Sequence, residues 1–179
     1  MARCSVVPQE TASYRPLFLA TGTYGETVRG VVTQEPGWAG YLAQGGPFTR
    51  VTGSFTVPPA PSSQRTDVAE WVGIGGYAAA DQLIQAGAWE TYDPAGGATP
   101  DVYAWWELWP SMVAQRVPRP VSEGATLTVT IWQEPSGRWA IEIVDPRWGS
   151  PYAAEASYTG AAASAEWIVE PPIDATTGA

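Results

Sequence analysis

The most constraining feature of this 179-residue chain is a succession of short alternating segments separated by turns rich in proline and glycine. The clearest alternation runs from Ala125 to Trp132, and the turn Pro135–Gly137 leads from it into Trp139–Val144. Side chains that alternate with a period of two suit a half-buried β-strand, and a short turn between two such strands makes a hairpin. These segments predict antiparallel β-structure, and no stretch has a helical period of useful length.

The same pattern recurs along most of the chain. Besides the hairpin, we expect strands at 38–42, 49–57, 70–74, 83–87, 103–109, 152–158 and 165–170. The polar, proline-containing stretch 110–124 is expected to be a loop. Many short strands with turn signals between them are typical of a β-sandwich or jelly roll. We therefore predict an all-β fold, with one antiparallel β-sandwich domain over residues 35–179 and an N-terminal extension over residues 1–34.

Charge and composition exclude several classes of function. The chain has 18 acidic and 9 basic residues, every basic residue is an arginine, and the net charge is −9. Without a basic stripe to neutralise phosphates, neither nucleic acid nor an anionic membrane surface is an expected partner. Histidine is absent, which removes the commonest general base near neutral pH and the commonest metal ligand. Catalysis would have to use carboxylates, amides or hydroxyls, and we expect no metal and no other cofactor.

Cys4 is the single cysteine of the chain, so no internal disulfide and no zinc cluster is expected. No apolar run approaches the ~20 residues of a membrane span. Residues 16–20 are too short for the apolar region of a signal peptide, so no export signal is visible.

Aromatic residues are more numerous than one small core needs, with 10 tryptophans and 8 tyrosines. Large rings give contact area at low entropic cost, which suits a binding surface. Some of these rings are therefore expected to line a concave groove.

Three polar residues, Gln85, Glu107 and Glu166, stand in the middle of expected strands. Alternation places Glu107 on one face with three rings, and burial among rings raises the pKa of a carboxyl group. If the three strands belong to one sheet, the three polar groups converge on a ring-lined face. The competing interpretation of any single one is the ordinary solvated face of a sheet.

The stretch 165–170 alternates acidic with apolar side chains. Its period places Glu166 and Glu170 on one face and Trp167 and Val169 on the other. We expect Trp167 and Val169 to point into a core and Glu166 to face the opposite side. Glu170 is expected to be a solvated strand end.

Five segments in series resemble the glutamic peptidases, or eqolisins, in their order and approximate spacing. They are Trp38–Tyr41, Trp71–Ile74, Leu83–Gly87, Ala104–Pro110 and Ala165–Glu170. The resemblance implies a concanavalin-like β-sandwich and an acid-acting endopeptidase that takes polypeptide substrates and needs no cofactor. It further suggests a bacterial-type member, secreted, which we expect to act as a monomer.

The resemblance also assigns roles to residues. The family's catalytic Gln falls on Gln85 and its catalytic Glu on Glu166. Further residues that line the family's site match Trp38, Trp71, Glu107 and Trp109. Glu166 would act as general base and then general acid, and Gln85 would donate to the oxyanion. Glu107, if close to Glu166, could share a proton with it.

The chain departs from the family pattern at several points. Gly75 and Tyr103 stand where the family commonly has aspartate, and Gly37 stands where it has asparagine. Family domains commonly continue with more strands after the catalytic Glu. Either this domain is truncated at its C-terminal side, or residues 1–34 fill that place in the sheet.

Two other functions remain open. A jelly-roll glycosidase would use Glu107 and Glu166 as acid and nucleophile, with the two carboxyl groups ~5–5.5 Å apart in a retaining enzyme. A non-catalytic module would bind carbohydrate or peptide in the aromatic groove. Gln85 separates these alternatives, because only the peptidase depends on it for catalysis.

Overall fold

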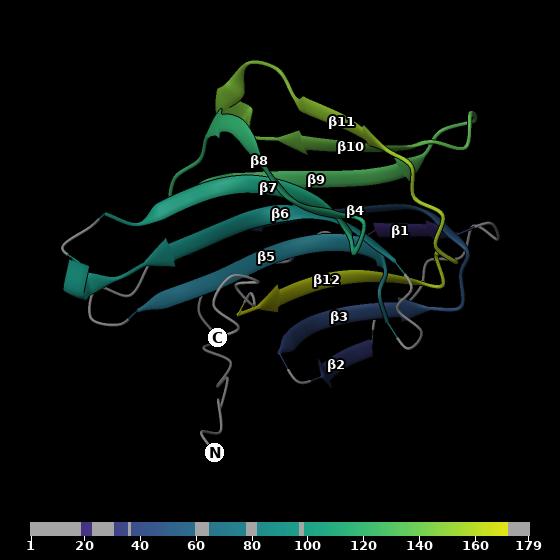
Figure 1. Cartoon of the computed structure of the whole chain (residues 1–179), viewed down its shortest axis with the longest axis horizontal. Coiled ribbons are helices and arrows are strands. Elements are labelled where there is room, and N and C mark those ends of the chain that lie inside the picture. Colours follow the sequence, from purple (N-terminus) through teal and green to yellow (C-terminus); the bar gives the residue numbers. More distant parts are fainter. Residues whose placement is uncertain are drawn as a thin grey trace.

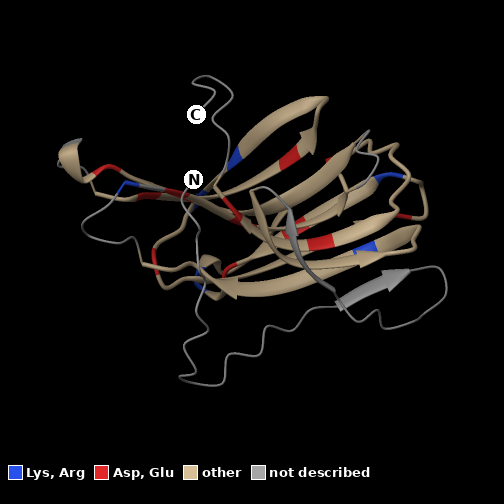
Figure 2. Cartoon of the chain, turned by 90° about the horizontal axis from the view of Figure 1, so that it is seen from below, with Lys and Arg blue, Asp and Glu red and all other residues tan. Residues whose placement is uncertain are grey.

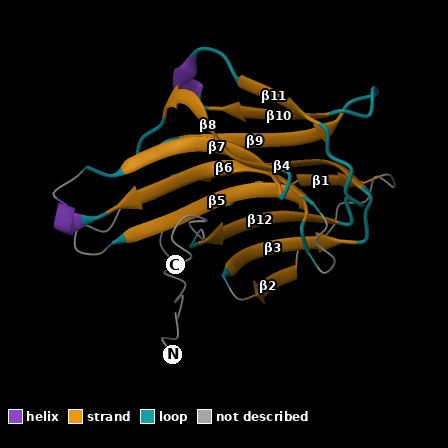
Figure 3. Cartoon of the chain, viewed as in Figure 1, coloured by secondary structure: helices purple, strands orange, loops and turns teal. Residues whose placement is uncertain are grey.

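The computed structural model describes residues 19–22, 31–35, 37–59, 65–77, 82–96 and 99–171. These residues form two antiparallel sheets packed face to face, with two short 3₁₀ helices, Pro94–Gly96 and Pro146–Trp148, between strands (Figures 1 and 3). The predicted all-β sandwich is confirmed. Among the described residues, no helix has the length and apolar character that crossing a membrane requires.

The smaller sheet has five strands in the order β1-β4-β9-β10-β11. Their bounds are β1 Leu19–Gly22, β4 Phe48–Thr56, β9 Thr126–Gln133, β10 Trp139–Val144 and β11 Tyr152–Ala156. Its outer face carries hydroxyl pairs across β4 and β9: Thr52 with Thr130 at 2.9 Å and Ser54 with Thr128 at 2.7 Å. Such cross-strand hydroxyl pairs suit an ordinary polar sheet surface.

The larger sheet has seven strands in the order β2-β3-β12-β5-β6-β7-β8. Their bounds are β2 Val31–Glu35, β3 Trp38–Gln44, β5 Thr66–Gly75, β6 Leu83–Tyr92, β7 Asp101–Trp109, β8 Met112–Pro120 and β12 Ser164–Glu170. Strand β12 lies between β3 and β5, so it is hydrogen-bonded along both of its edges. The last described strand of the chain is therefore an inner strand of its sheet.

Two strands come from the predicted N-terminal extension. Strand β1 pairs with β4 at one edge of the smaller sheet, and β2 pairs with β3 at one edge of the larger sheet. Residues 1–18, which include Cys4, and residues 23–30 lie outside the described residues. The domain boundary at residue 35 stays a prediction.

The core lies between the sheets and is built from the inward-facing side of each strand. It includes Val51, Leu127, Ile131 and Ile141 of the smaller sheet and Val72, Ile84, Trp106 and Trp167 of the larger one. The Trp167 indole nitrogen donates to the Thr52 carbonyl oxygen at 2.8 Å, which links the two sheets. A Cβ atom on Gly53 would come within 2.7 Å of Trp167 Cδ1, so a glycine at this position makes room for the ring.

Two expectations about these strands were wrong. The stretch 110–124, predicted to be a loop, contains strand β8, whose one partner among the described strands is β7. Among residues 112–120 only Val117 is buried, so the alternation that marks a strand is missing, and prolines are tolerated on such an edge. Val169, predicted to enter a core, is 44% exposed, because the inner face of β12 opens into a pocket at this end.

Two carboxyl groups, those of Glu70 and Glu90, are buried on the core side of β5 and β6. Three of their carboxyl oxygens have no hydrogen-bond partner within the described structure: both oxygens of Glu90 and the Oε2 of Glu70. Burial, followed by the nearby Glu90 charge, raises the pKa of Glu70 to about 7. Burial and then the charge of Glu123 raise the pKa of Glu90. Both shifts favour the protonated form relative to a solvated carboxyl group.

The raised pKa of Glu70 predicts that the free energy of unfolding falls as the pH rises. Its pKa is 4.5 in a solvated chain and about 7 in the fold. The stabilising effect of the extra bound proton is thus complete below pH 4.5 and is lost as the pH rises to about 7, a change of about 3 kcal/mol. Urea unfolding at both ends of this range should show a smaller loss for Glu70→Gln than for wild type. Glu155→Gln, at an exposed carboxylate, should match wild type. Equal losses in wild type and Glu70→Gln would contradict the prediction.

Candidate active site

The outer face of the seven-stranded sheet carries polar groups in a single line. Strand register pairs Leu42, Glu166, Gly73, Gln85 and Glu107 in that order across β3, β12, β5, β6 and β7. Residues directly opposite one another in adjacent strands project from the same face. The structure thus brings Gln85, Glu107 and Glu166 onto one line, which we call the central row.

Gly73 separates the two residues to which catalysis was assigned. Adjacent strands lie about 4.8 Å apart, so the backbones of Glu166 and Gln85 are about 10 Å apart, with only a glycine between them. Side chains of this length can reach toward a common point above Gly73. The sequence signal for this gap was a glycine inside an expected strand, which often marks a close approach.

Glu107 lies too far along the row to share a proton with Glu166. Two strands stand between them, which places their backbones about 14 Å apart. The Glu107 partner is Gln85, whose Nε2 donates to Glu107 Oε2 at 2.6 Å. Burial raises the pKa of Glu107, and this hydrogen bond opposes the rise. The suggestion that Glu107 and Glu166 share a proton directly is therefore wrong.

The Gln85 side chain is buried and oriented by that bond. One of the two hydrogens on Nε2 points at Glu107, which leaves the second available as a donor. The Oε1 atom is buried and has no hydrogen-bond partner among the described residues. By accepting this hydrogen bond, the Glu107 carboxyl group orients the side-chain amide of Gln85.

Glu166 is fully buried, with 0% of its surface exposed. Neither of its carboxyl oxygens has a hydrogen-bond partner in the described part of the chain. Burial raises the pKa of Glu166 well above its usual range. The Ser164 hydroxyl, two residues earlier on the same face, lies near enough to offset part of this rise without making a hydrogen bond. No pattern in the sequence singled out Ser164.

Two apolar side chains cover the centre of the row. A Cβ atom on Gly73 would lie 2.9 Å from both Leu83 Cδ1 and Trp71 Cζ3, so these groups occupy the space above the glycine. Leu83 and Trp71 are themselves buried. Leu83 and Trp71 thus cover the outer face over Gly73, and the groove expected from the sequence stays a prediction.

Tryptophans flank the central row on both sides. In the next row, Trp71 pairs with Gly87, which pairs with Trp105. A Cβ atom on Gly87 would overlap the backbone of β5, so a glycine is required between the two rings. Trp38 packs edge-on against Trp71, with ring centroids 4.9 Å apart. On the other side, Trp109 pairs with Leu83 and is 45% exposed.

Glu170 is not the solvated strand end that the sequence suggested. The Trp71 indole nitrogen donates to Glu170 Oε1 at 3.0 Å. Burial raises the pKa of Glu170, the indoles of Trp71 and Trp38 lower it by less, and the charge of Glu107 adds to the rise. Glu170 therefore belongs to the same acidic and aromatic face as the central row.

Basic residues do not gather on this face. In Figure 2 the blue positions are scattered singly over the strands, while red positions occur along several of them. Arg116 lies over the Tyr103 ring at 4.2 Å and pairs with Asp101 at 2.6 Å, toward the edge strand β8. In the part of the chain that the structure describes, no group of three or more His, Cys, Asp or Glu side chains is arranged to hold a metal ion.

A comparison with known proteins identifies the family of this chain. The model of the Peptidase A4 family matches residues 36–178. The chain belongs to the Peptidase A4 family. Scytalidopepsin B of Scytalidium lignicola is 28% identical over 142 residues, which cover 77% of this chain and 52% of that protein. Aspergillopepsin-2 of Aspergillus niger is 27% identical over 157 residues, covering 74% of this chain and 55% of that protein.

The chain spans about half the length of these curated Peptidase A4 relatives. Its fold resembles scytalido-glutamic peptidase solved with a transition state analog inhibitor, with a TM-score of 0.63 and 22% identity over 77% of this chain and 66% of that one. It also resembles SCP-B, an eqolisin solved with the tripeptide Ala-Ile-His, with a TM-score of 0.58 and 23% identity over 77% of this chain and 65% of that one. These likenesses establish the fold of the sandwich.

The indole bond to Glu170 gives a test of the site's electrostatics. Trp71→Phe removes the donor that holds down the pKa of Glu170, so that pKa should rise further. A ¹³C-carboxyl NMR titration of Glu170 measures it directly. Trp109→Phe, which changes an exposed ring elsewhere on this face, should leave the pKa of Glu170 unchanged. A fall in the Glu170 pKa in Trp71→Phe would contradict the assignment.

Proposed function

We propose that this chain is a glutamic-type endopeptidase that hydrolyses polypeptide substrates with Glu166 and Gln85. The observation that carries the proposal is the central row, in which these two side chains flank a single glycine on one face of the sheet. Membership of the Peptidase A4 family supports a peptide hydrolase. No step of the chemistry requires a metal or a cofactor.

Each chemical step has a group to perform it. Glu166, as a carboxylate, takes a proton from a water above Gly73 while the water oxygen attacks the peptide carbonyl carbon. The second Nε2 hydrogen of Gln85 donates to the oxyanion that forms. Glu166 then returns the proton to the leaving amine nitrogen as the carbon–nitrogen bond breaks. Glu107 positions Gln85 through the 2.6 Å bond and touches no reacting atom.

The pH dependence follows from the ionisation of Glu166. The base must be ionised, whereas burial favours its protonated form. The substrate and its water must therefore displace the covering side chains, and hydrogen bonds from them then lower the pKa of Glu166 toward the acidic range. Gln85 does not titrate, so the oxyanion donor persists at low pH. Acid action, secretion and a monomeric state are parts of this proposal.

The two alternative functions fit the geometry less well. A glycosidase places its two carboxyl groups ~5–5.5 Å apart when retaining and ~6.5–9.5 Å apart when inverting. The two strands between Glu107 and Glu166, and the bond from Gln85 to Glu107, oppose the shorter, retaining spacing. A binding module gives no role to the placement of Gln85 and Glu166 on either side of Gly73.

Cleavage of an acid-denatured protein across acidic pH tests the proposal. Glu166→Gln removes the general base and should lower kcat about 10²–10⁴-fold at every pH. A Glu155→Gln control on β11 should keep wild-type activity. Proteolysis at the wild-type rate in Glu166→Gln would exclude the dyad, and hydrolysis of a polysaccharide instead would favour the glycosidase.

The variants Gln85→Ala and Glu107→Gln distinguish the oxyanion donor, Gln85, from the residue that orients it, Glu107. Loss of the donor in Gln85→Ala should lower kcat about 10²–10³-fold. In Glu107→Gln the donor remains but is less firmly oriented, so kcat should fall by less, with KM little changed. Steady-state kinetics on a fluorogenic peptide give both values. A larger kcat loss in Glu107→Gln than in Gln85→Ala would show that Glu107 acts in the chemistry itself.

A further inference from the structure

The Trp71 indole spans two separate points on the outer face of the larger sheet. At one edge of the ring, Cζ3 occupies the space above Gly73, 2.9 Å from where a Cβ atom would stand. At the other edge, Nε1 donates to Glu170 Oε1 at 3.0 Å. An indole is rigid, so its two edges move together. The Glu170 carboxyl group is thereby connected to the gap between Glu166 and Gln85.

The bond to Glu170 orients the Trp71 ring within packing that is otherwise apolar. The other members of its cluster are buried apolar residues: Ala69, Leu83, Trp105 and Ile168. Apolar burial is non-directional and fills space without selecting one orientation of a ring. A hydrogen bond requires donor and acceptor to be aligned. The bond therefore favours the orientation in which the ring covers Gly73.

The strength of this bond depends on the ionisation of Glu170. A hydrogen bond to a carboxylate is roughly twice as strong as one between neutral groups. Burial raises the pKa of Glu170, the bonds from the indoles of Trp71 and Trp38 lower it by less, and the charge of Glu107 raises it further. Glu170 therefore takes up its proton at a higher pH than a solvated glutamate, and its hold on the ring weakens there.

The neighbouring strands present both indoles and carboxyl groups to Glu170. Strand β3 presents the uncharged indole of Trp38, and β7 presents Glu107. On β5, the carboxyl group of Asp67 accepts a bond from the Trp89 indole at 2.7 Å. Asp67 thus repeats the arrangement of a carboxyl group bonded to an indole, at a different ring.

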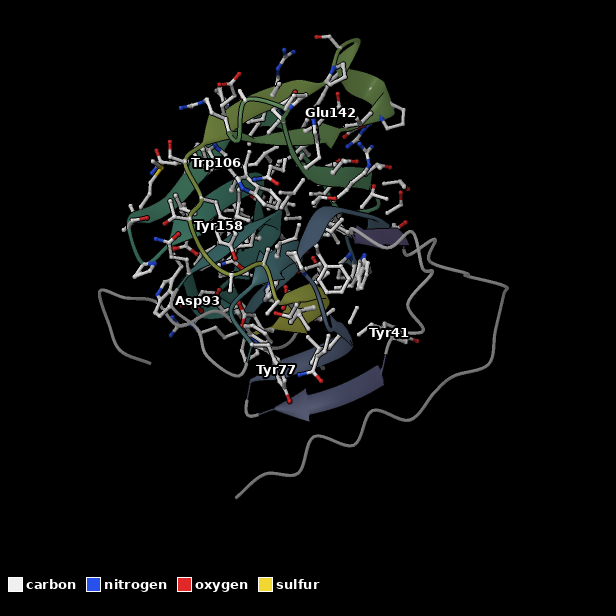
Figure 4. All side chains as sticks on the ribbon, turned by 90° about the vertical axis from the view of Figure 1, so that its right-hand side faces the viewer. Tyr41, Tyr77, Asp93, Trp106, Glu142 and Tyr158 are labelled. Atoms are coloured by element: carbon white, nitrogen blue, oxygen red, sulfur yellow. The ribbon has the colours of Figure 1, made fainter. Side chains whose placement is uncertain are left out.

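Other carboxyl groups lie on the same strand or on other faces. On β12 itself, Glu166 stands four residues before Glu170 on the same face. Glu70 of β5 is buried on the core side of the sheet. Figure 4 shows Glu142 of β10, in the smaller sheet, far from Tyr41 of β3, the strand beside β12. The protonation of Glu170 is thus governed by its burial, by two indoles and by the acidic groups of its own sheet.

We propose that Glu170 is a positioning residue that acts through Trp71. As a carboxylate it holds the indole over Gly73 and closes the centre of the row, and its protonation in acid frees the ring to move aside. The inference rests on the proposed function, because the space above Gly73 is where the attacking water is placed. It adds a reason for acid action that is separate from the chemistry of Glu166.

Closure by Trp71 acts on substrate binding and leaves the chemical step alone. The apparent affinity for a substrate falls by the fraction of molecules whose site is open. Glu170 therefore affects KM, whereas kcat is set by Glu166 and Gln85 once the ring has moved.

The first test is ¹⁹F NMR of the full chain prepared with 5-fluorotryptophan. The fluorine replaces the hydrogen on Cζ3, so it reports from the edge of the ring that covers Gly73. Trp71→Phe identifies the Trp71 signal. That signal should shift as the pH falls through the Glu170 titration, and this step should be lost in Glu170→Gln, where the acceptor is neutral at every pH. The wild-type titration needs no variant to fold.

The second test is the kinetics of a fluorogenic peptide across the same pH range. Above the Glu170 titration, the KM of Glu170→Gln should be about fivefold below that of wild type, because a neutral acceptor holds the ring less strongly. Below the titration the two KM values should agree, and kcat should agree throughout. A merely structural role of Glu170 would not give a difference in KM that vanishes in acid.

Asp67→Asn is the matched control, because it removes another carboxylate that accepts an indole bond on this face. Its partner, Trp89, pairs with Ala69, four residues from Gly73. Asp67→Asn should leave both the Trp71 titration and KM as in wild type.

Three results would overturn the proposal: a Trp71 signal that titrates alike in wild type and Glu170→Gln, equal KM values at every pH, or the same effects in Asp67→Asn. If wild type cleaves no peptide, the proposed function fails, and the fluorine titration alone decides whether Glu170 holds Trp71.

Discussion

The site depends on the register with which β12 is hydrogen-bonded between β3 and β5. That register pairs Glu166 with Leu42 on one side and with Gly73 on the other. A slip of one residue would turn every side chain of β12 to the opposite face. Glu166 would then enter the core, and Trp167 would lose its bond to the Thr52 carbonyl across the sandwich. The packing of Trp167 therefore fixes the position of the carboxylate beside it.

Glycines determine how the outer face of the larger sheet is used. Gly73 leaves a gap in the central row, and Gly87 allows Trp71 and Trp105 to stand on either side of it. Gln85 and Glu166 of the row are buried, and in the described structure Gln85 Oε1 and both carboxyl oxygens of Glu166 lack hydrogen bonds. Such groups cost stability, which suits a site whose polar atoms are completed by substrate and water.

Much of this arrangement could be predicted from local pattern. Alternation within single strands placed Glu107 with its rings and separated Glu166 from Trp167, because a strand has a fixed period of two. Strand β8 was missed since an edge strand buries little and so lacks that pattern. The environment of Glu170 was missed because its indole partner, Trp71, is 99 residues away in the chain. Which strands are neighbours, and hence that Gly73 lies between Glu166 and Gln85, depends on long-range pairing that no local pattern encodes.

The position of β12 has a consequence for the order in which the molecule assembles. The β6–β7 pair, which joins Gln85 to Glu107, connects segments close in sequence and can form early. Strand β12 must find β3 and β5, whose residues were made roughly a hundred positions earlier, and insert between them. Every other described strand precedes it in the chain. A chain made only as far as β7 thus carries Gln85 and its partner Glu107 without Glu166, and the proposed pair of Gln85 and Glu166 is complete only once β12 has inserted between β3 and β5.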